Sequence, residues 1–139
     1  MRFADPDRTR GTSSIRERGQ AAVEFALVLP LLAILLFGII QFGILFYTYI
    51  DLTAAAREGA RRAAVSRTAV NPVQTVKDTV TSATSVVDDS QDTVSVTPGV
   101  PWTTGQDVDV KLTYPYSLNI MGVVIWNGPM IAEAHARVE

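Results

Sequence analysis

The sequence contains no cysteine and a single histidine, His135. Without disulfides, a small domain has to gain its stability from packing, from a lipid bilayer or from partner subunits. The sequence therefore lacks the residues that form zinc sites and the residues that form histidine- or cysteine-based nucleophiles. It also contains no glycine-rich phosphate loop. His135 lies between Glu133 and Arg137 on the outward side of a predicted strand, which is typical of a solvated surface residue. We therefore expect no enzymatic activity and no cofactor.

The sequence also lacks a continuous basic region. Its 12 basic and 14 acidic residues give a formal net charge of -2 and fall into three zones of different sign. Arginines dominate residues 1–19 and 51–70, whereas acidic residues outnumber basic ones in residues 71–139. Nucleic acid binding requires a basic patch or stripe, so we expect no nucleic acid partner.

Formal charge is absent from residues 25–50. As a helix this run would measure about 39 Å, against about 30 Å of hydrocarbon, so it is long enough to span a bilayer with tilt or to project beyond it. Tyr47 and Tyr49 near its end are typical of an interfacial aromatic belt, although aromatic residues also occur near helix ends without that role. A secretory signal cleaved near residues 54–56 is the alternative, but signal-peptide apolar cores are only about 7–15 residues long. The sequence therefore predicts a transmembrane helix in contact with membrane lipid.

The number of arginines on each side of this helix gives little indication of its orientation in the membrane. Five arginines precede it and four follow within twenty residues, so the cytoplasmic side is not evident from positive charge alone. The acidic, strand-rich remainder favours an exported domain. We therefore expect a single-pass protein of the cell membrane, with a cytoplasmic amino terminus and an extracytoplasmic carboxy-terminal domain.

One carboxylate, Glu24, lies just inside the apolar region. Unpaired at the bilayer centre it would cost about 2.5–3.5 kcal/mol, and less near the edge. The stretch "RGQAAVEFALVLPLL", followed by "FGIIQFG", "AAREGARRAA" and a terminal "ARVE", resembles the TadE family of bacterial pilin-like proteins from Tad (Flp) type IVb pilus systems. The resemblance is strong over residues 16–67 and loose over the last forty.

This resemblance implies a pseudopilin or minor pilin with roles in pilus assembly and adhesion. A prepilin peptidase would cut after Gly19, exposing a new α-amine at Gln20, where many type IV pilins have phenylalanine. Glu24 and Phe25 would act in assembly, with the carboxylate meeting the amine of a neighbouring chain and setting subunit register. The implied partners are the peptidase, the major Flp-type pilin, other pilin-like proteins and an inner-membrane platform driven by an ATPase. After assembly the protein would lie in a pilus or at the cell surface.

Simpler interpretations of these residues stay open. Glu24 can be an unpartnered carboxylate at headgroup depth, and Gly19 the last residue of a flexible leader. Pro30 is expected to kink the helix, either as a weak point for leaving the membrane or as a tolerated bend. The rival function is a permanently anchored extracytoplasmic binding domain that is never cut.

The fold class predicted is α+β. We expect a basic cytoplasmic leader over residues 1–19, a transmembrane helix over 20–50, a helical extension over 51–70 and a domain of one helix and a three-stranded antiparallel sheet over 71–139. The extension should bury small apolar residues on one face, listed here: Leu52, Ala56, Ala60, Ala63 and Ala64. Its arginines face outward, either towards lipid phosphates and acidic neighbours or simply towards solvent.

The sequence "NP" predicts a second helix with Asn71 as N-cap and Pro72 at its first position. Its apolar residues recur at helical spacing to about residue 87: Val73, Val76, Val80, Ala83 and Val87. Alternation then predicts strands in "DTVSVT", "DVDVKLTYPY" and "MIAEAHARVE". The inward residues are Val94, Val96, Val108, Val110, Leu112, Tyr114, Met130, Ala132, Ala134, Ala136 and Val138.

Two segments between these elements are expected to be irregular. Residues 97–106 form a linker, and residues 117–129 a loop rich in apolar side chains that either fills the core or contacts another subunit. In "VDDSQD", Asp88, Asp89 and Asp92 have no EF-hand spacing, so a solvated loop is a better interpretation than a calcium site.

Overall fold

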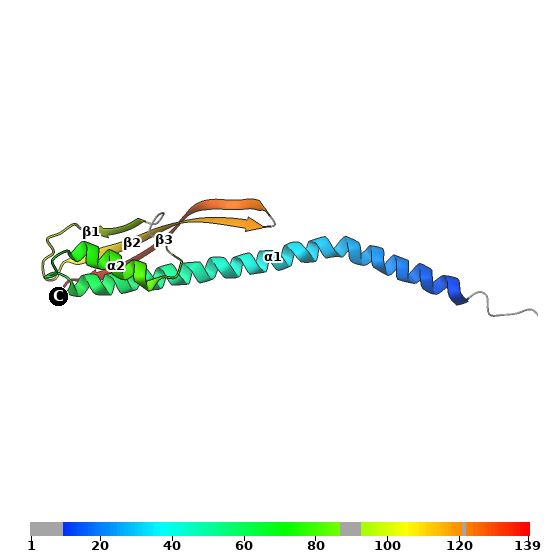
Figure 1. Cartoon of the computed structure of the whole chain (residues 1–139), viewed down its shortest axis with the longest axis horizontal. Coiled ribbons are helices and arrows are strands. Elements are labelled where there is room, and N and C mark those ends of the chain that lie inside the picture. The colour runs from blue at the N-terminus through cyan, green and yellow to red at the C-terminus, as the bar shows by residue number, and fades with distance from the viewer. Residues whose placement is uncertain (1–9, 87–92, 121) are drawn as a thin grey trace, which may run out of the picture. The chain divides into compact units, whose positions relative to one another are not determined.

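The computed structural model describes residues 10–86, 93–120 and 122–139, with side chains from Gly19 onward (Figure 1). Its elements are α1 (Arg10–Val65), α2 (Pro72–Ala83), β1 (Thr93–Thr97), β2 (Asp107–Ile120) and β3 (Val123–Arg137). The three strands form one antiparallel sheet in the order β1-β2-β3. The predicted α+β class, with a long apolar amino-terminal helix, is confirmed.

The chain divides into two compact units, Met1–Ile39 and Ile40–Glu139. The described side chains of the first unit, all from α1, are exposed with few exceptions. α1 begins at Arg10, ahead of the expected start near Gln20, because no proline interrupts residues 10–19 and most of them tolerate a helix. By length and composition, the part Gly19–Val65 is the one described helix able to cross a membrane.

The core of the second unit lies between the sheet and one face of α1. Val108, Val110 and Leu112 of β2 are fully buried, as the alternation predicted. Most of the predicted small-residue face of α1 packs against them: Leu52, Ala56, Ala60 and Ala63 are buried, whereas Ala64 is only half-buried. Ala55, which was not predicted, is buried as well. Small side chains let the helix approach the sheet closely. At the end of the chain, the backbone N–H of Glu139 donates to the carbonyl of Ala64 at 3.0 Å, which joins the end of the sheet to the end of α1.

α2 covers the same core through Val76 and Val80, which are fully buried. A side chain on Gly59 of α1 would overlap Val80, so α2 crosses α1 at a position where only glycine fits. Asn71 occupies the N-cap position, but its side chain makes no capping hydrogen bond, and only its carbonyl accepts from Thr75, at 3.0 Å.

The predicted length of α2 is wrong. The helix ends at Ala83, which is exposed, and Val87 lies outside the described residues together with Asp88, Asp89 and Asp92. The physical reason is Thr84, whose backbone is extended, with φ -116° and ψ 146°. Thr84 and Ser85 bond to α1 instead of continuing the helix.

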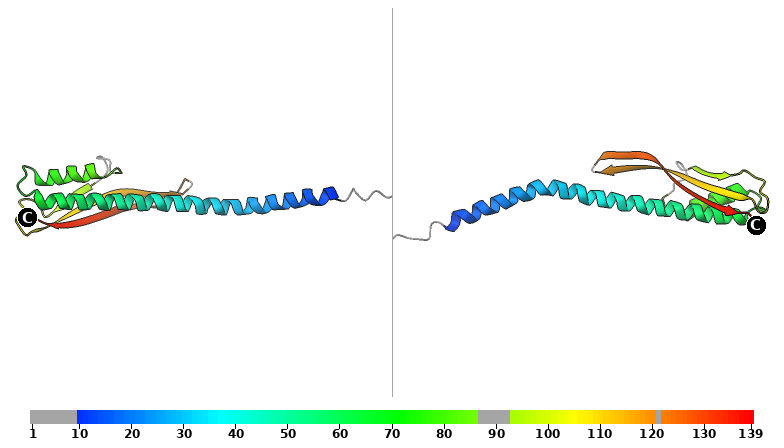
Figure 2. Two further views of the ribbon diagram at one scale, coloured as in Figure 1. Left: turned by 90° about the horizontal axis from the view of Figure 1, so that it is seen from below. Right: turned by 180° about the vertical axis from the view of Figure 1, so that it is seen from behind.

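The predicted loop over residues 117–129 is also wrong. β2 continues to Ile120 and β3 starts at Val123, so this segment is a two-stranded hairpin in which Leu118 pairs with Trp126. Gly122, with φ +87°, supplies the turn, and its N–H donates to Oδ1 of Asn119 at 2.9 Å. The β-branched and aromatic residues that suggested a core-filling loop have strand propensity, and most of them are exposed. Figures 1 and 2 show this hairpin running alongside α1 within the second unit.

Candidate functional site

The residues predicted to matter for processing lie on consecutive turns of α1. Gly19, Gln20, Glu24 and Phe25 are all helical and exposed. The side-chain amide of Gln20 donates a hydrogen bond to Oε1 of Glu24 at 3.1 Å, one helical turn apart. The structure therefore brings Gln20 and Glu24 into contact within one chain and leaves the outer side of the carboxylate open.

Among the residues that the structure describes, no atom lies within 4 Å of the position that a β-carbon on Gly19 would occupy. Packing within the chain therefore gives no reason for glycine at this position. The peptide bond after Gly19 lies in a regular helix, whose backbone groups are engaged in hydrogen bonds. A peptidase that binds extended backbone would have to unwind about one turn before cutting there.

Pro30 lies inside α1, and the helix continues on both sides of it. Proline has no N–H to donate to the carbonyl of Ala26, so one helical hydrogen bond is missing at this point. Phe25 is 60% exposed, and its apolar neighbours in this part of α1 are exposed in the same way. Such a surface, apolar on all sides, fits a lipid or a protein partner better than water.

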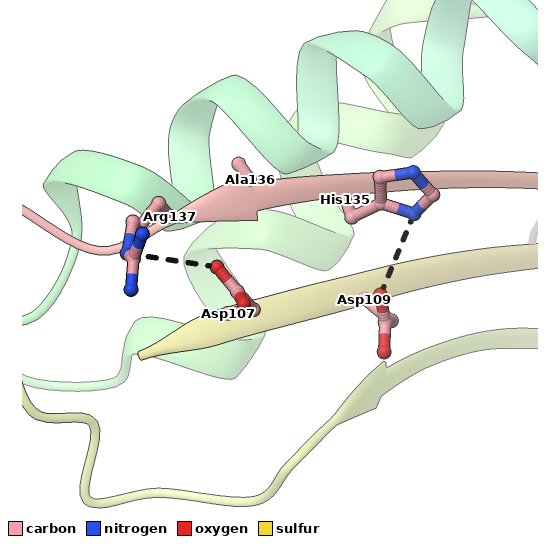
Figure 3. Close-up of a pocket in the computed structure, with 5 residues that line it drawn as sticks. All are labelled: Asp107, Asp109, His135, Ala136 and Arg137. Atoms are coloured by element: carbon pink, nitrogen blue, oxygen red, sulfur yellow. Dashed lines mark ion pairs between the residues drawn. The ribbon is translucent and has the colours of Figure 1, made fainter. Parts of the chain in front are cut away.

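A second group of chemistry-bearing residues lies on the outer face of the sheet (Figure 3). Arg137 Nε lies 3.8 Å from Oδ1 of Asp107, and His135 Nδ1 lies 3.6 Å from Oδ1 of Asp109. These residues pair directly across β2 and β3 and line a shallow depression of about 470 Å³. All four side chains are about half exposed or more, so solvent screens both pairs and each contributes little to stability.

His135 is thus the solvated surface residue that the sequence predicted. The contact of His135 with Asp109 was not predicted, although the pairing of antiparallel strands could have suggested it. The arginines of α1 also face outward as expected: Arg61 Nε lies 3.7 Å from Oε2 of Glu58, with both side chains at least half exposed.

Aromatic residues form a feature that sequence reasoning missed. Tyr116 and Trp126 come from opposite strands of the hairpin, and their ring centroids lie 6.4 Å apart. Burial raises the pKa of Tyr116, and the nearby Tyr114 raises it further. The other tryptophan, Trp102, is buried and donates from Nε1 to the carbonyl of Pro98 at 2.9 Å.

Residues 19–61 match the family model TadE, described as TadE-like protein. The matched segment starts at Gly19 and includes Gln20, Glu24 and the whole charge-free run of α1, residues 25–50. It confirms the resemblance indicated by the sequence motifs, and it favours a pilus-associated membrane protein over an enzyme. No curated protein and no solved structure matches the chain.

Proposed function

We propose that this TadE-like chain is a pilin-like subunit or assembly factor of a Tad (Flp) pilus, cut by a prepilin peptidase after Gly19. The observation that supports this most directly is the family match, because it begins at the proposed cleavage residue and runs along the membrane-spanning helix. In this proposal the mature chain starts at Gln20 and packs with other pilin-like proteins through α1.

The proposed role of Glu24 follows from its position. Its carboxylate lies on an apolar helix where an unpaired charge is costly, and among the side chains that the structure describes it accepts a single hydrogen bond, from the amide of Gln20. Cleavage would place a positively charged α-amine on Gln20. A carboxylate and an amine on adjacent chains satisfy each other only when the two helices are offset by a fixed amount, so their pairing sets register. Phe25, the next residue, would pack in the same contact.

Pro30 has a proposed role in moving the subunit. The helix lacks one backbone hydrogen bond there, so bending or local melting costs least at this point. A subunit that leaves the bilayer for a filament has to change its surroundings along this part of α1. We assign Pro30 as the position where the helix yields.

The remaining partners follow from the same proposal. The amino terminus lies in the cytoplasm, where a basic leader over residues 1–19 precedes the cut, and the second unit lies outside the cytoplasm. The major Flp-type pilin, other pilin-like proteins and an ATPase-driven platform in the inner membrane would handle the mature subunit.

Intact-mass measurement of the membrane-extracted protein tests the proposal. Cells with the prepilin peptidase should yield a chain that begins at Gln20, and cells without it should yield the uncut chain. The matched control is Gly19→Val, which blocks close approach by the peptidase and should retain the leader in both strains. If the leader is retained in the wild-type protein with an active peptidase, the proposal fails, and a permanently anchored extracytoplasmic binding domain takes its place.

A further inference from the structure

In the proposed mature chain, the carboxylate of Glu24 has two possible α-amine partners. In the first turn of a helix, a carboxylate can reach back to the backbone nitrogen three residues earlier, and side chains four residues apart are also neighbours. The amine on Gln20 of the same chain is therefore one partner, and the amine of an adjacent chain is the other. A pair within one chain would satisfy the carboxylate without setting any register between chains.

The side chains next to Glu24 on its own helix include one hydrogen-bond donor. Residues three and four positions apart share a helix face, and at these positions the chain has Gln20, Ala21, Leu27 and Val28. Three of these residues are apolar, whereas the amide of Gln20 can donate. It does so in the structure, where Nε2 of Gln20 lies 3.1 Å from Oε1 of Glu24. Gln20 is therefore the residue of this face that holds the carboxylate.

This hydrogen bond occupies the carboxylate on the side from which the chain's own amine would approach. Gln20 lies one helical turn before Glu24, and its side-chain amide and its future α-amine belong to the same residue. While Oε1 accepts from the amide, Oε2 remains for a donor from outside the chain, because Leu27 and Val28, the next side chains along this face, have none. A carboxylate accepts at both oxygens, so the two contacts are compatible.

The surroundings of the pair strengthen this hydrogen bond. The apolar neighbours Phe25, Leu27 and Val28 are 60%, 75% and 48% exposed, so they cover α1 with an apolar surface around the carboxylate. In lipid or in a contact between helices, water does not compete for the carboxylate as it does at an aqueous surface, and a hydrogen bond to a charged acceptor is stronger there. The amide is thus held at Oε1 before a neighbouring chain arrives.

We propose that the side-chain amide of Gln20 directs Glu24 towards the α-amine of an adjacent chain, by occupying the oxygen that faces its own. Gln20 is then a positioning residue, and its side chain disfavours pairing within one chain. This role rests on the proposed cleavage and pairing. It gives the first residue of the mature chain two separate functions, because its backbone amine serves the neighbour and its side chain serves its own chain.

The contact itself is tested in the uncut chain, by NMR in lipid nanodiscs that hold one copy each. The side-chain NH2 signals of Gln20 should move as the pH falls through the range in which carboxylates protonate, and Glu24→Ala should abolish the movement. Gln74 is the matched positive control, since its amide donates to Oδ1 of Asp78 at 2.7 Å over the same spacing. Gln41 is the negative control, because no carboxylate lies three or four positions from it. Signals of Gln20 that do not respond to Glu24 overturn the proposal.

The choice of amine is tested in the mature chain. A leader that ends in the site of a purified protease, cut so that Gln20 becomes the first residue, yields this chain even if the cell's own peptidase does not act. Failure of the proposed cleavage and failure of the positioning by Gln20 are then separate results. Acetylation of the α-amine, followed by mass spectrometry of the amino-terminal peptide, measures its pairing, because a protonated amine does not react.

Single-copy discs contain only the chain's own amine. There, Glu24→Ala should leave acetylation unchanged in the wild-type background, because the carboxylate is held away from the amine. In the Gln20→Met background, whose side chain has a similar length and no donor, Glu24→Ala should speed acetylation about tenfold, the typical effect of an opposite charge within about 4–6 Å on the protonation of a group. Equal responses in the two backgrounds, whether large or absent, overturn the proposal.

Vesicles that hold several copies add the amine of a neighbouring chain. In them the wild-type amine should react about tenfold more slowly than in single-copy discs, and Glu24→Ala should remove this protection. If the wild-type amine reacts equally fast in vesicles and in discs, the pairing between chains and its register role fail. The comparison in single-copy discs still decides the role of Gln20 in that case.

Discussion

Asp51 of α1 accepts hydrogen bonds from Thr84, a residue that lies 33 positions later in the chain. The hydroxyl of Thr84 and the backbone N–H of Ser85, at 3.1 Å, both donate to Oδ2 of this carboxylate. Asp51 is the first charged residue after the apolar run, so the end of α2 is joined to α1 where the helix leaves its apolar part. The carboxylate stops α2 and positions the chain that follows.

We predict that Asp51→Ala lowers the free energy of unfolding of the second unit by about 1–2 kcal/mol, because two donors lose a charged acceptor in a half-buried position. Asp51→Asn should restore part of the loss, since an amide oxygen can still accept. Chemical unfolding in detergent, followed by Trp102 fluorescence, measures the change. Glu58→Ala is the control, because its pair with Arg61 is exposed, and an equal loss in both variants would contradict the prediction.

Gly59 should tolerate no side chain. We predict that Gly59→Ala destabilises the unit by about 1–3 kcal/mol, because the added methyl group overlaps Val80 and has to displace α2. The gain in helix propensity, about 1 kcal/mol, opposes this loss only in part. Gly43→Ala in the same helix meets no neighbouring atom and should be neutral or stabilising in the same unfolding measurement. Unchanged stability of Gly59→Ala would show that α2 does not pack as described.

Glu24 should matter through its charge. We predict that Glu24→Ala and Glu24→Gln both reduce assembled surface pili severely, while cleavage after Gly19 continues, because only a carboxylate can form an ion pair with the charged α-amine of a neighbouring chain. Glu24→Asp keeps the charge on a shorter side chain and should retain partial assembly. Pilus counts by electron microscopy, with intact mass from the same cells, separate the two steps. Normal pili in the Glu24→Ala strain would rule out the register role.

Tyr116 should make the free energy of unfolding decrease with rising pH in the alkaline range. Its pKa is raised in the folded protein, so the folded state keeps the phenol proton after the unfolded state has lost its own near the ordinary pKa of 10.0. Stability from this group is therefore complete below about pH 10 and declines as the pH rises through the folded pKa. Tyr116→Phe should flatten the decline, measured as unfolding free energy on both sides of pH 10.0.

The variant Tyr114→Phe separates the two causes of this shift. Burial is the larger cause and the neighbouring Tyr114 the smaller, so most of the alkaline decline should survive the substitution. A complete loss of the decline in Tyr114→Phe would assign the effect to the neighbour.

Much of the fold could be predicted because burial repeats with a fixed period along each element. Val108, Val110 and Leu112 alternate with polar residues, and Leu52, Ala56 and Ala60 recur at helical spacing, so their buried faces were evident in the sequence. The hydrogen bond from Gln20 to Glu24 joins residues four apart on a helix, and this relationship is also local.

The errors concern features that depend on distant parts of the chain. Gly122, Gly128 and Pro129 are typical of loops, and residues 123–129 form a strand because they pair with residues 115–120 of β2. The end of α2 depends on Asp51, which only the tertiary structure brings to Thr84. The roles of Gly19 and Pro30 involve a peptidase and a membrane exit, so they stay predictions.

The lengthwise packing of α1 against the strands has a mechanical consequence. The small-residue face of α1 and the inward residues of the sheet contact each other in a row along the helix axis, closed at one end by the bond between Glu139 and Ala64. A force that pulls the helix along its own axis therefore acts on all of these contacts at the same time, in shear. It cannot break them one after another. The second unit is thus built to hold its helix under tension.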